Sequence, residues 1–195
     1  MKILAFTDLH ENMEFFKELE RKSKKADIVI CAGDFTIFNH GCKKMVKTIA
    51  SLKKPTYLIH GNHENMSQVE EECKLYDNIR FIHKKVFRVN GINIFGYGGG
   101  GFSYIDRDFE NFIEKHKILL TKKNILVTHQ PPYNTIVDEI VEDEHAGSKS
   151  IKKYLNHFNL AISGHLHETF NKQEVINKKT LVINPSPTGM LIEIN

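Results

Sequence analysis

The chain has 195 residues, of which 41% are hydrophobic and 26% are charged, and these values are typical of a soluble globular protein rather than a disordered or membrane protein. The net charge is only +3 and the lysines are spread along the sequence, so we expect no nucleic-acid partner. The three cysteines include no close pair, which argues against a disulfide framework or a thiolate zinc site and favours a reducing compartment.

The first half of the chain alternates short apolar strands with amphipathic helices. The apolar run at the N-terminus reaches Asp8 at once and is too short for a signal peptide or a spanning helix, so we expect a cytoplasmic protein with no membrane partner. The alternation implies right-handed crossovers and a mostly parallel sheet, in which ligands bind beyond the carboxyl ends of the strands. The predicted elements are strands at 2–6, 26–32 and 56–59 and helices at 11–25, 41–54 and 67–75.

The second half of the chain is richer in short strands. Asn90-Gly91 between two apolar runs predicts a hairpin, and Ser148 is expected to cap a helix. The glycine-rich loop 96–104 carries Tyr97, Phe102 and Tyr104, and is interpreted either as a surface loop or as a lid that contacts substrate. The predicted elements are strands at 79–82, 86–89, 92–95, 124–128 and 159–162, helices at 109–120 and 148–157, a loop or lid at 130–147, and closing antiparallel strands at 170–175, 180–183 and 189–194. Without a linker or repeat, residues 1–195 are interpreted as one domain.

Five of the predicted strands end in side chains that can ligate a metal or transfer a proton. These residues are Asp8, His10, Asp34, Asn62, His63, His129, His165 and His167. Oxygen and imidazole donors without a thiolate suit manganese, iron, cobalt or zinc. The donors are too many for one ion, whereas two ions roughly 3.5–4 Å apart with a shared carboxylate would use them all, as in metal-assisted phosphoester hydrolysis. Two carboxylates leave a surplus of positive charge, which would acidify a bridging water to hydroxide and attract a phosphate. Five other histidines are interpreted as ordinary polar residues: His40, His60, His83, His116 and His157.

Five ordered motifs contain these residues and span most of the chain. They are Asp8-Leu9-His10, Gly33-Asp34, Gly61-Asn62-His63-Glu64, Thr128-His129 and Gly164-His165-Leu166-His167. In order and spacing they resemble the calcineurin-like metallophosphoesterases, in particular the small single-domain prokaryotic type. The resemblance implies an α/β fold, a four-layer α-β-β-α sandwich with two mixed sheets.

The resemblance also implies roles for the motif residues. One divalent ion would be held by Asp8, His10 and His167, a second by Asn62, His129 and His165, and Asp34 would bridge the two. His63 would contact the phosphate and assist the leaving group without being a ligand. Glu64 is expected to orient the loop, and Gly61 to let the backbone turn.

One departure from the family pattern follows Asp34, where the acidic residue that many members carry is missing from Phe35-Thr36-Ile37-Phe38. The segment from His129-Gln130-Pro131-Pro132 to His145-Ala146-Gly147-Ser148 is similar to a loop of small members of the family. His145 is therefore a weaker substrate-binding candidate, together with the aromatic residues of the glycine-rich loop.

Because the spacing between motifs leaves no room for a capping domain, we expect an open site. We predict a dinuclear metal-dependent hydrolase, with manganese favoured, that cleaves phosphoester bonds through a metal-bridging hydroxide. Its substrate is expected to be a small or nucleotide-like phosphodiester. The alternatives are a phosphomonoesterase with the same metals and a non-catalytic scaffold of the same fold, which could dispense with His63. Nothing in the sequence indicates a homo-oligomer.

Overall fold

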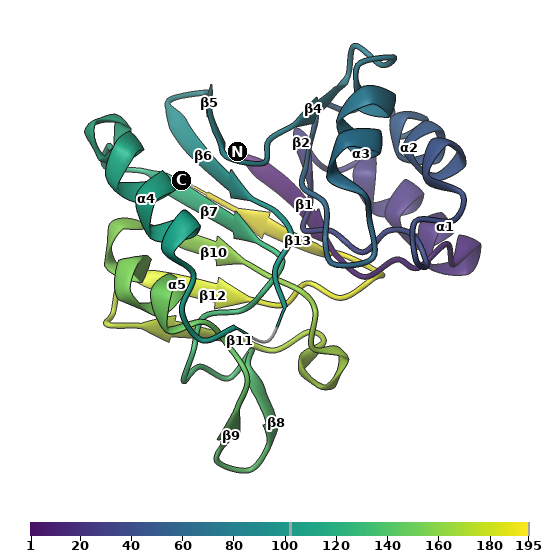
Figure 1. Ribbon diagram of the computed structural model, residues 1–195. Helices are drawn as coiled ribbons and strands as arrows, with labels where there is room; N and C mark the ends of the chain where they lie inside the picture. The colour runs from purple at the N-terminus through teal and green to yellow at the C-terminus, as the bar shows by residue number, and fades with distance from the viewer. Residues whose placement is uncertain (102, 195) are drawn as a thin grey trace.

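The computed structural model describes residues 1–101 and 103–194, and these form two large sheets that lie face to face (Figure 1). The first sheet has the strand order β13 (Met190–Glu193), β1 (Lys2–Phe6), β2 (Ile28–Cys31), β3 (Thr56–Leu58) and β4 (Ile79–Phe81). The second has the order β11 (Gln173–Ile176), β12 (Thr180–Ile183), β10 (Leu160–Ile162), β7 (Asn124–Thr128), β6 (Ile92–Tyr97) and β5 (Lys85–Val89). Both sheets are mixed, as predicted.

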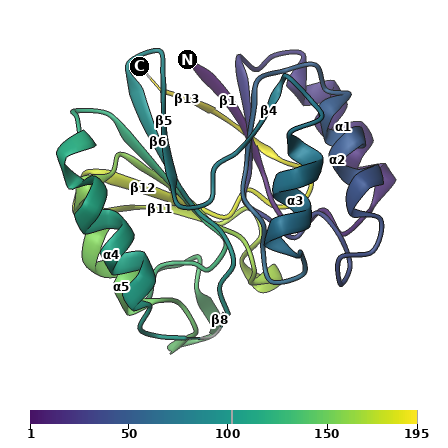
Figure 2. The same cartoon turned by 45° about the horizontal axis from the view of Figure 1, so that its top comes forward.

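Helices cover the outer face of each sheet. The first sheet is covered by α1 (Met13–Ser23), α2 (Cys42–Ala50) and α3 (Met66–Cys73), and the second by α4 (Arg107–His116) and α5 (Lys149–Tyr154). Figure 2 shows the two groups of helices on opposite sides, with the strands between them. Short 3-10 turns, η1 (Lys117–Leu119) and η2 (Leu155–His157), follow α4 and α5, and η3 (His167–Thr169) lies in the segment between β10 and β11. The predicted four-layer α-β-β-α sandwich is confirmed.

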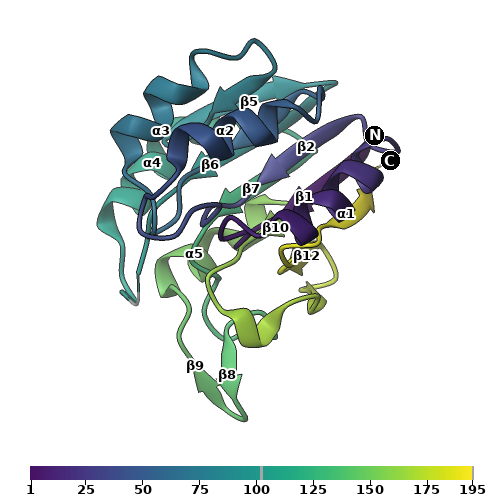
Figure 3. The same ribbon diagram turned by 90° about the vertical axis from the view of Figure 1, so that its right-hand side faces the viewer.

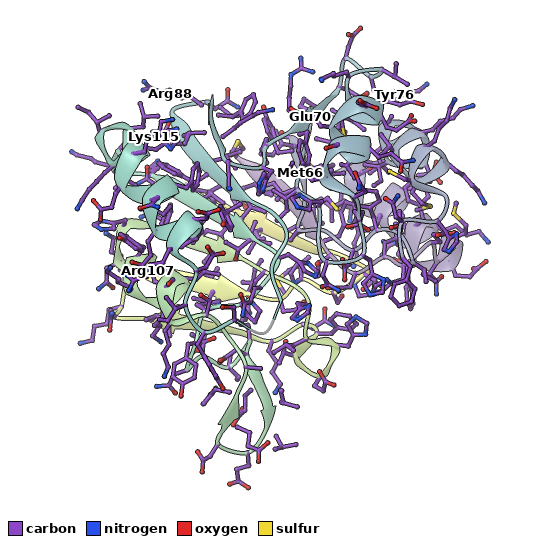
Figure 4. All side chains as sticks on the ribbon, viewed as in Figure 1. Met66, Glu70, Tyr76, Arg88, Arg107 and Lys115 are labelled. Carbon is purple, nitrogen blue, oxygen red and sulfur yellow. The ribbon has the colours of Figure 1, made fainter. Side chains whose placement is uncertain are left out.

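Strand β1 shows why the layers form. Its alternate side chains Ile3 and Ala5 pack in the cluster between the sheets, whereas Leu4 and Phe6 pack in the cluster under the helices of the first layer. All four are inaccessible to solvent. A strand that is buried on both faces reads as a continuous apolar run, which is what the sequence has at this position. The drawing with side chains shows the space between the layers filled, with Glu70 on the α3 half and Arg88 and Lys115 on the other half (Figure 4).

Capping side chains determine the residues at which the helices begin more accurately than the apolar pattern does. Asn12 accepts hydrogen bonds from the backbone N–H groups of Glu14 and Phe15, so α1 begins two residues later than expected. The predicted cap at Ser148 is confirmed, because its hydroxyl accepts the N–H of Ile151.

The closing strands differ from the prediction of three antiparallel strands. β12 pairs parallel with β10 and antiparallel only with β11, whereas β13 crosses to the first sheet and pairs antiparallel with β1. The chain ends therefore meet, and the N-terminal amine donates to the carbonyl of Ile194, as the adjacent termini in Figure 3 illustrate. Local patterns cannot reveal which sheet a strand joins, because pairing partners lie far apart in sequence.

The predicted loop or lid at 130–147 contains a small hairpin, β8 (Glu139–Val141) and β9 (Glu144–His145), which projects from the lower edge in Figures 1 and 3. Among the helices of the described ranges, none is long and apolar enough to cross a membrane. The interpretation of residues 1–195 as one domain stays a prediction.

Candidate metal centre

The predicted site residues come together where strands of the two sheets end. Asp8, Asp34 and Asn62 follow β1, β2 and β3 of the first sheet, and His129 and His165 follow β7 and β10 of the second. Three groups of histidine and carboxylate side chains offer ligand atoms within 4.8 Å of one another: Asp8, His10 and His167; His10, Asp34 and His63; and Asp34, His129 and His165. The sites implied by the family resemblance correspond to the first and third groups.

The first group lies at the opening of the site. His167 Nε2 is 3.5 Å from Asp8 Oδ1 and 3.3 Å from His10 Nε2. Asp8 is buried, whereas the side chain of His167 is 53% exposed, so a ligand held here would face solvent. The Nδ1–H of His10 donates to the carbonyl oxygen of Thr36 at 2.9 Å. That bond leaves the lone pair of His10 Nε2 directed into the group, as metal-ligating histidines require.

The third group, Asp34, His129 and His165, lies deeper. His129 is fully buried, and its Nδ1–H donates to the carbonyl oxygen of Ala32 at 2.8 Å. Its Nε2 lies 3.2 Å from Asp34 Oδ2 and 3.0 Å from Asn62 Oδ1, and His165 Nδ1 lies 2.9 Å from the same amide oxygen. Four donor atoms of different side chains therefore converge without an intervening hydrophobic group.

His63 lies beside Asp34 and has its own support. Its backbone N–H donates to Asp34 Oδ1 at 2.9 Å, and its Nε2 is 3.9 Å from Asp34 Oδ2. The backbone N–H of Phe38 donates to His63 Nδ1 at 3.1 Å. Because Nδ1 accepts this bond, a neutral His63 carries its proton on Nε2, the atom that faces the carboxylate.

The backbone of the site is strained where the candidate ligands are placed. Asp8, His10, Asp34 and His165 have positive φ angles of 50°, 43°, 50° and 72°. Residues with a Cβ rarely adopt this left-handed conformation, and such strain is concentrated at functional sites.

Two glycines allow segments of the site to approach one another. A Cβ on Gly61 would lie 2.0 Å from Asp34 Oδ1, and one on Gly164 would lie 1.9 Å from Thr7 Oγ1 and 2.4 Å from Asp8 Oδ2. Any side chain at these positions would displace the candidate ligands. Gly61 was expected to permit a turn, but here it permits close contact with a carboxylate.

Glu64 joins the two loops that follow β2 and β3 of the first sheet. Its Oε2 accepts the backbone N–H groups of Asp34 at 2.9 Å and Gly61 at 2.8 Å. Its Oε1 accepts the N–H and the hydroxyl of Thr36, each at 2.8 Å. Burial and the nearby charge of Asp34 raise the pKa of Glu64. These hydrogen bonds identify the groups through which Glu64 can orient the loops, as expected from the sequence.

The electrostatics of the site favour a bound positive charge. Burial disfavours a charged His129, yet its hydrogen bond and Coulomb attraction to Asp34 outweigh this effect and raise its pKa to about 9. Burial would also raise the pKa of Asp34, but the interaction with His129 lowers it to about 2. In the described part of the chain, Asp8 and Asp34 form ion pairs with histidines and with no lysine or arginine. A proton or a cation must therefore supply the compensating charge.

The weaker substrate-binding candidates are separated by the structure. Tyr97 is buried against Phe109, and its hydroxyl donates to Asp106, so its ring belongs to the core of the second layer rather than to the site. Tyr104 is exposed and its hydroxyl donates to the carbonyl oxygen of His145. Phe102 lies outside the described residues.

The His145 side chain also has a structural partner. Its Nδ1 is 2.8 Å from the buried carboxylate of Asp138, which additionally accepts backbone N–H groups from Asn134, Thr135 and Gly147. His145 therefore fastens the base of the β8–β9 hairpin and is absent from the three candidate metal groups.

The sequence interpretation missed the contributions of Thr7 and Phe38. The hydroxyl of Thr7 donates to Asp8 Oδ2 at 2.7 Å and orients that carboxylate. The backbone N–H of Phe38 supports His63, whereas the sequence of this segment indicates only a missing acidic residue. The turn-forming run Asn39-His40-Gly41 directly after Phe38 was the available signal for an exposed loop beside the site.

Comparisons with known proteins find similar sequences. A family model described as calcineurin-like phosphoesterase matches residues 1–169. An uncharacterized protein of Methanocaldococcus jannaschii is 31% identical over 210 residues, which cover 98% of this chain and 91% of that protein. A probable glycerophosphodiester phosphodiesterase of Arcobacter nitrofigilis is 26% identical over 163 residues, which cover 73% of this chain and 57% of that protein.

Solved structures share the fold. A protein of Thermus thermophilus has a TM-score of 0.78 at 16% identity, covering 96% of this chain and 89% of that one. A dimetal phosphatase from Danio rerio has a TM-score of 0.64 at 9% identity, covering 94% and 86%. At these identities the similarity concerns the arrangement of sheets and helices alone.

Proposed function

Since the chain belongs to the calcineurin-like phosphoesterase family, we propose that it is a dinuclear metal-dependent phosphodiesterase acting on small or nucleotide-like phosphoesters. One observation carries the proposal: the donor groups of the two sheets meet at Asp34, with the proton-bearing Nε2 of His63 beside it.

The donor set fits divalent cations. It offers carboxylate and amide oxygens and imidazole nitrogens, and the rings of His10 and His129 are held by Nδ1–H bonds to backbone carbonyls. One ion would be held by Asp8, His10 and His167, the other by Asn62, His129 and His165, and both by Asp34; we favour manganese. Bound ions would supply Lewis acidity that activates water and neutralises phosphate charge.

The protein's own contribution is to orient these groups and to donate one hydrogen bond to the leaving group. Thr7 and the backbone N–H of His165 orient the Asp8 carboxylate, while Glu64 fixes the loops that carry Asp34 and Gly61. Phosphoester cleavage leaves negative charge on the departing oxygen. The Nε2–H of a neutral His63 can donate a hydrogen bond to that oxygen and stabilise its charge, while a proton from water completes the alcohol.

Exposure supports a diester substrate. The side chains of His10, His63 and His167 are 20%, 21% and 53% exposed, so a phosphate at the first group would have room for a second ester substituent. The partial similarity to a probable glycerophosphodiester phosphodiesterase is consistent with this preference.

Manganese-loaded protein should hydrolyse bis(p-nitrophenyl) phosphate with a higher kcat/KM than p-nitrophenyl phosphate, since the two substrates share a leaving group. Asp34→Asn should abolish both reactions. A higher kcat/KM for the monoester would favour the phosphomonoesterase, and manganese binding without hydrolysis of either substrate would favour the scaffold.

A further inference from the structure

We propose that Phe38 forms the leaving-group wall of the active site and makes the enzyme prefer phosphoesters whose leaving group is aromatic or planar, such as a nucleoside. The inference rests on the proposed phosphoesterase function, and it adds a substrate class and a specificity-determining residue to that function.

The exposure of Phe38 is the first observation. Its surface is 75% accessible, although removing a phenyl ring from water is energetically favourable. The ring is not isolated, because it stacks on the imidazole of His63 with centroids 4.6 Å apart and an interplanar angle of 29°. Phe38 thus covers one face of His63 and presents most of its own surface to solvent at the opening of the site.

The backbone holds the ring in this position at a conformational cost. Phe38 and Asn39 both have positive φ angles, 46° and 63°, a conformation that residues with a Cβ rarely adopt. The loop is held by side chains: Asn39 accepts the backbone N–H of Asn65 at 2.9 Å and donates to Gln68 at 2.6 Å. Glu11 accepts the N–H of Ile37 at 3.3 Å. These bonds fix the loop, so the ring is presented rather than left loose.

The position of Phe38 relative to His63 identifies what it contacts. A leaving oxygen that accepts a hydrogen bond from Nε2–H must lie about 2.6–3.2 Å from that atom. The Phe38 centroid is 4.6 Å from the centroid of the same imidazole ring. The group attached to the leaving oxygen is therefore within reach of the phenyl ring, on which a planar group can stack and a short aliphatic alcohol gains little.

The substitutions Phe38→Ala and Phe38→Leu test this inference, because both keep the backbone N–H that donates to His63. Ile118→Ala is the matched control, since Ile118 is 92% exposed and lies in η1. With manganese-loaded protein, kcat/KM for bis(p-nitrophenyl) phosphate should fall about tenfold in Phe38→Ala, mainly through KM, as expected for loss of one stacking contact. Hydrolysis of glycerophosphoethanolamine should change less than about threefold, and the control variant should resemble the wild type.

Binding provides a readout without turnover. Phenylphosphonate and methylphosphonate have no ester bond to cleave, so calorimetry on the manganese-loaded protein compares their Kd values directly. The wild type should prefer phenylphosphonate by about tenfold, and Phe38→Ala should lose that preference. Equal affinities in the wild type, or a preference kept by Phe38→Ala, would overturn the inference even if the enzyme hydrolyses diesters. A preference lost in Phe38→Ala without hydrolysis of any ester would instead refute the proposed function and leave the aromatic contact established.

Discussion

Replacing Glu64 by glutamine should weaken the support of the site without replacing a candidate ligand. The carboxylate accepts four hydrogen bonds from Asp34, Gly61 and Thr36. A glutamine can keep its oxygen toward Asp34 and Gly61, and its amide can donate to the Thr36 hydroxyl. The backbone N–H of Thr36 is then left buried without an acceptor.

The expected cost follows from these bonds. One unsatisfied buried N–H costs about 1–3 kcal/mol, and bonds to a charged acceptor are roughly twice as strong as neutral ones. We therefore expect Glu64→Gln to lower the free energy of unfolding by about 2–4 kcal/mol. The affinity for manganese should fall as well, because the loop that carries Asp34 loses its fixed position.

Urea unfolding of the metal-free protein, followed by circular dichroism, measures the first effect, and calorimetric titration with manganese measures the second. Glu70→Gln is the matched control on α3, since the Glu70–Lys85 pair of 2.7 Å is partly exposed and such pairs contribute about 0–1 kcal/mol. If Glu64→Gln were as stable as Glu70→Gln and bound manganese as the wild type does, the role of Glu64 as the support of the site would be refuted.

Three other substitutions test separate parts of the structure. His63→Ala should leave manganese affinity unchanged and lower kcat by ~10²–10⁴, and an equal loss of metal would show that His63 is a ligand. Gly164→Ala places a Cβ 1.9 Å from Thr7 Oγ1 and should cost about 1–3 kcal/mol and weaken manganese binding, whereas Gly101→Ala, with nothing within 4 Å, should do neither; unfolding and calorimetry compare them. Burial lowers the pKa of His83 to about 4 from 6.5, so the unfolded chain binds more protons than the folded one between these values. The unfolding free energy, measured by urea unfolding, should therefore fall more steeply from pH 6.5 to 4 in the wild type than in His83→Asn. This variant keeps an acceptor at the place of Nδ1. An equal fall of the unfolding free energy in both proteins would contradict the prediction.

The strands before the candidate ligands could be predicted because their chemistry is local. A buried apolar run followed by Asp8 or Asp34 predicts both the strand and the polar group at its end. The structure has β1 and β7 at the predicted bounds. The pairing of β13 with β1 could not be predicted, since an edge strand of either sheet shows the same alternation.

The parts of the site that escaped prediction act through backbone atoms or across long separations. Phe38 supports His63 with its N–H, a group that every residue except proline has, so its identity carried no signal for that role. The burial of Tyr97 was not predicted for a different reason. Its position beside a glycine-rich loop suggested exposure, although the residue ends β6.

Two of the three candidate metal groups draw on both sheets, and this explains why the site depends on the whole fold. Asp8 and His10 of the first sheet meet His167, which follows β10 of the second, while Asp34 and Asn62 of the first meet His129 and His165 of the second. An ion bound to either group would thus link the two layers whose apolar faces form the central cluster. Because the unfolded chain cannot hold these groups together, ion binding adds its free energy to the packing of the sheets, by about 2.7 kcal/mol at a concentration one hundred times the Kd. Packing of the apolar faces and assembly of the metal groups are therefore coupled, and a substitution that separates the sheets should weaken metal binding without altering a single ligand.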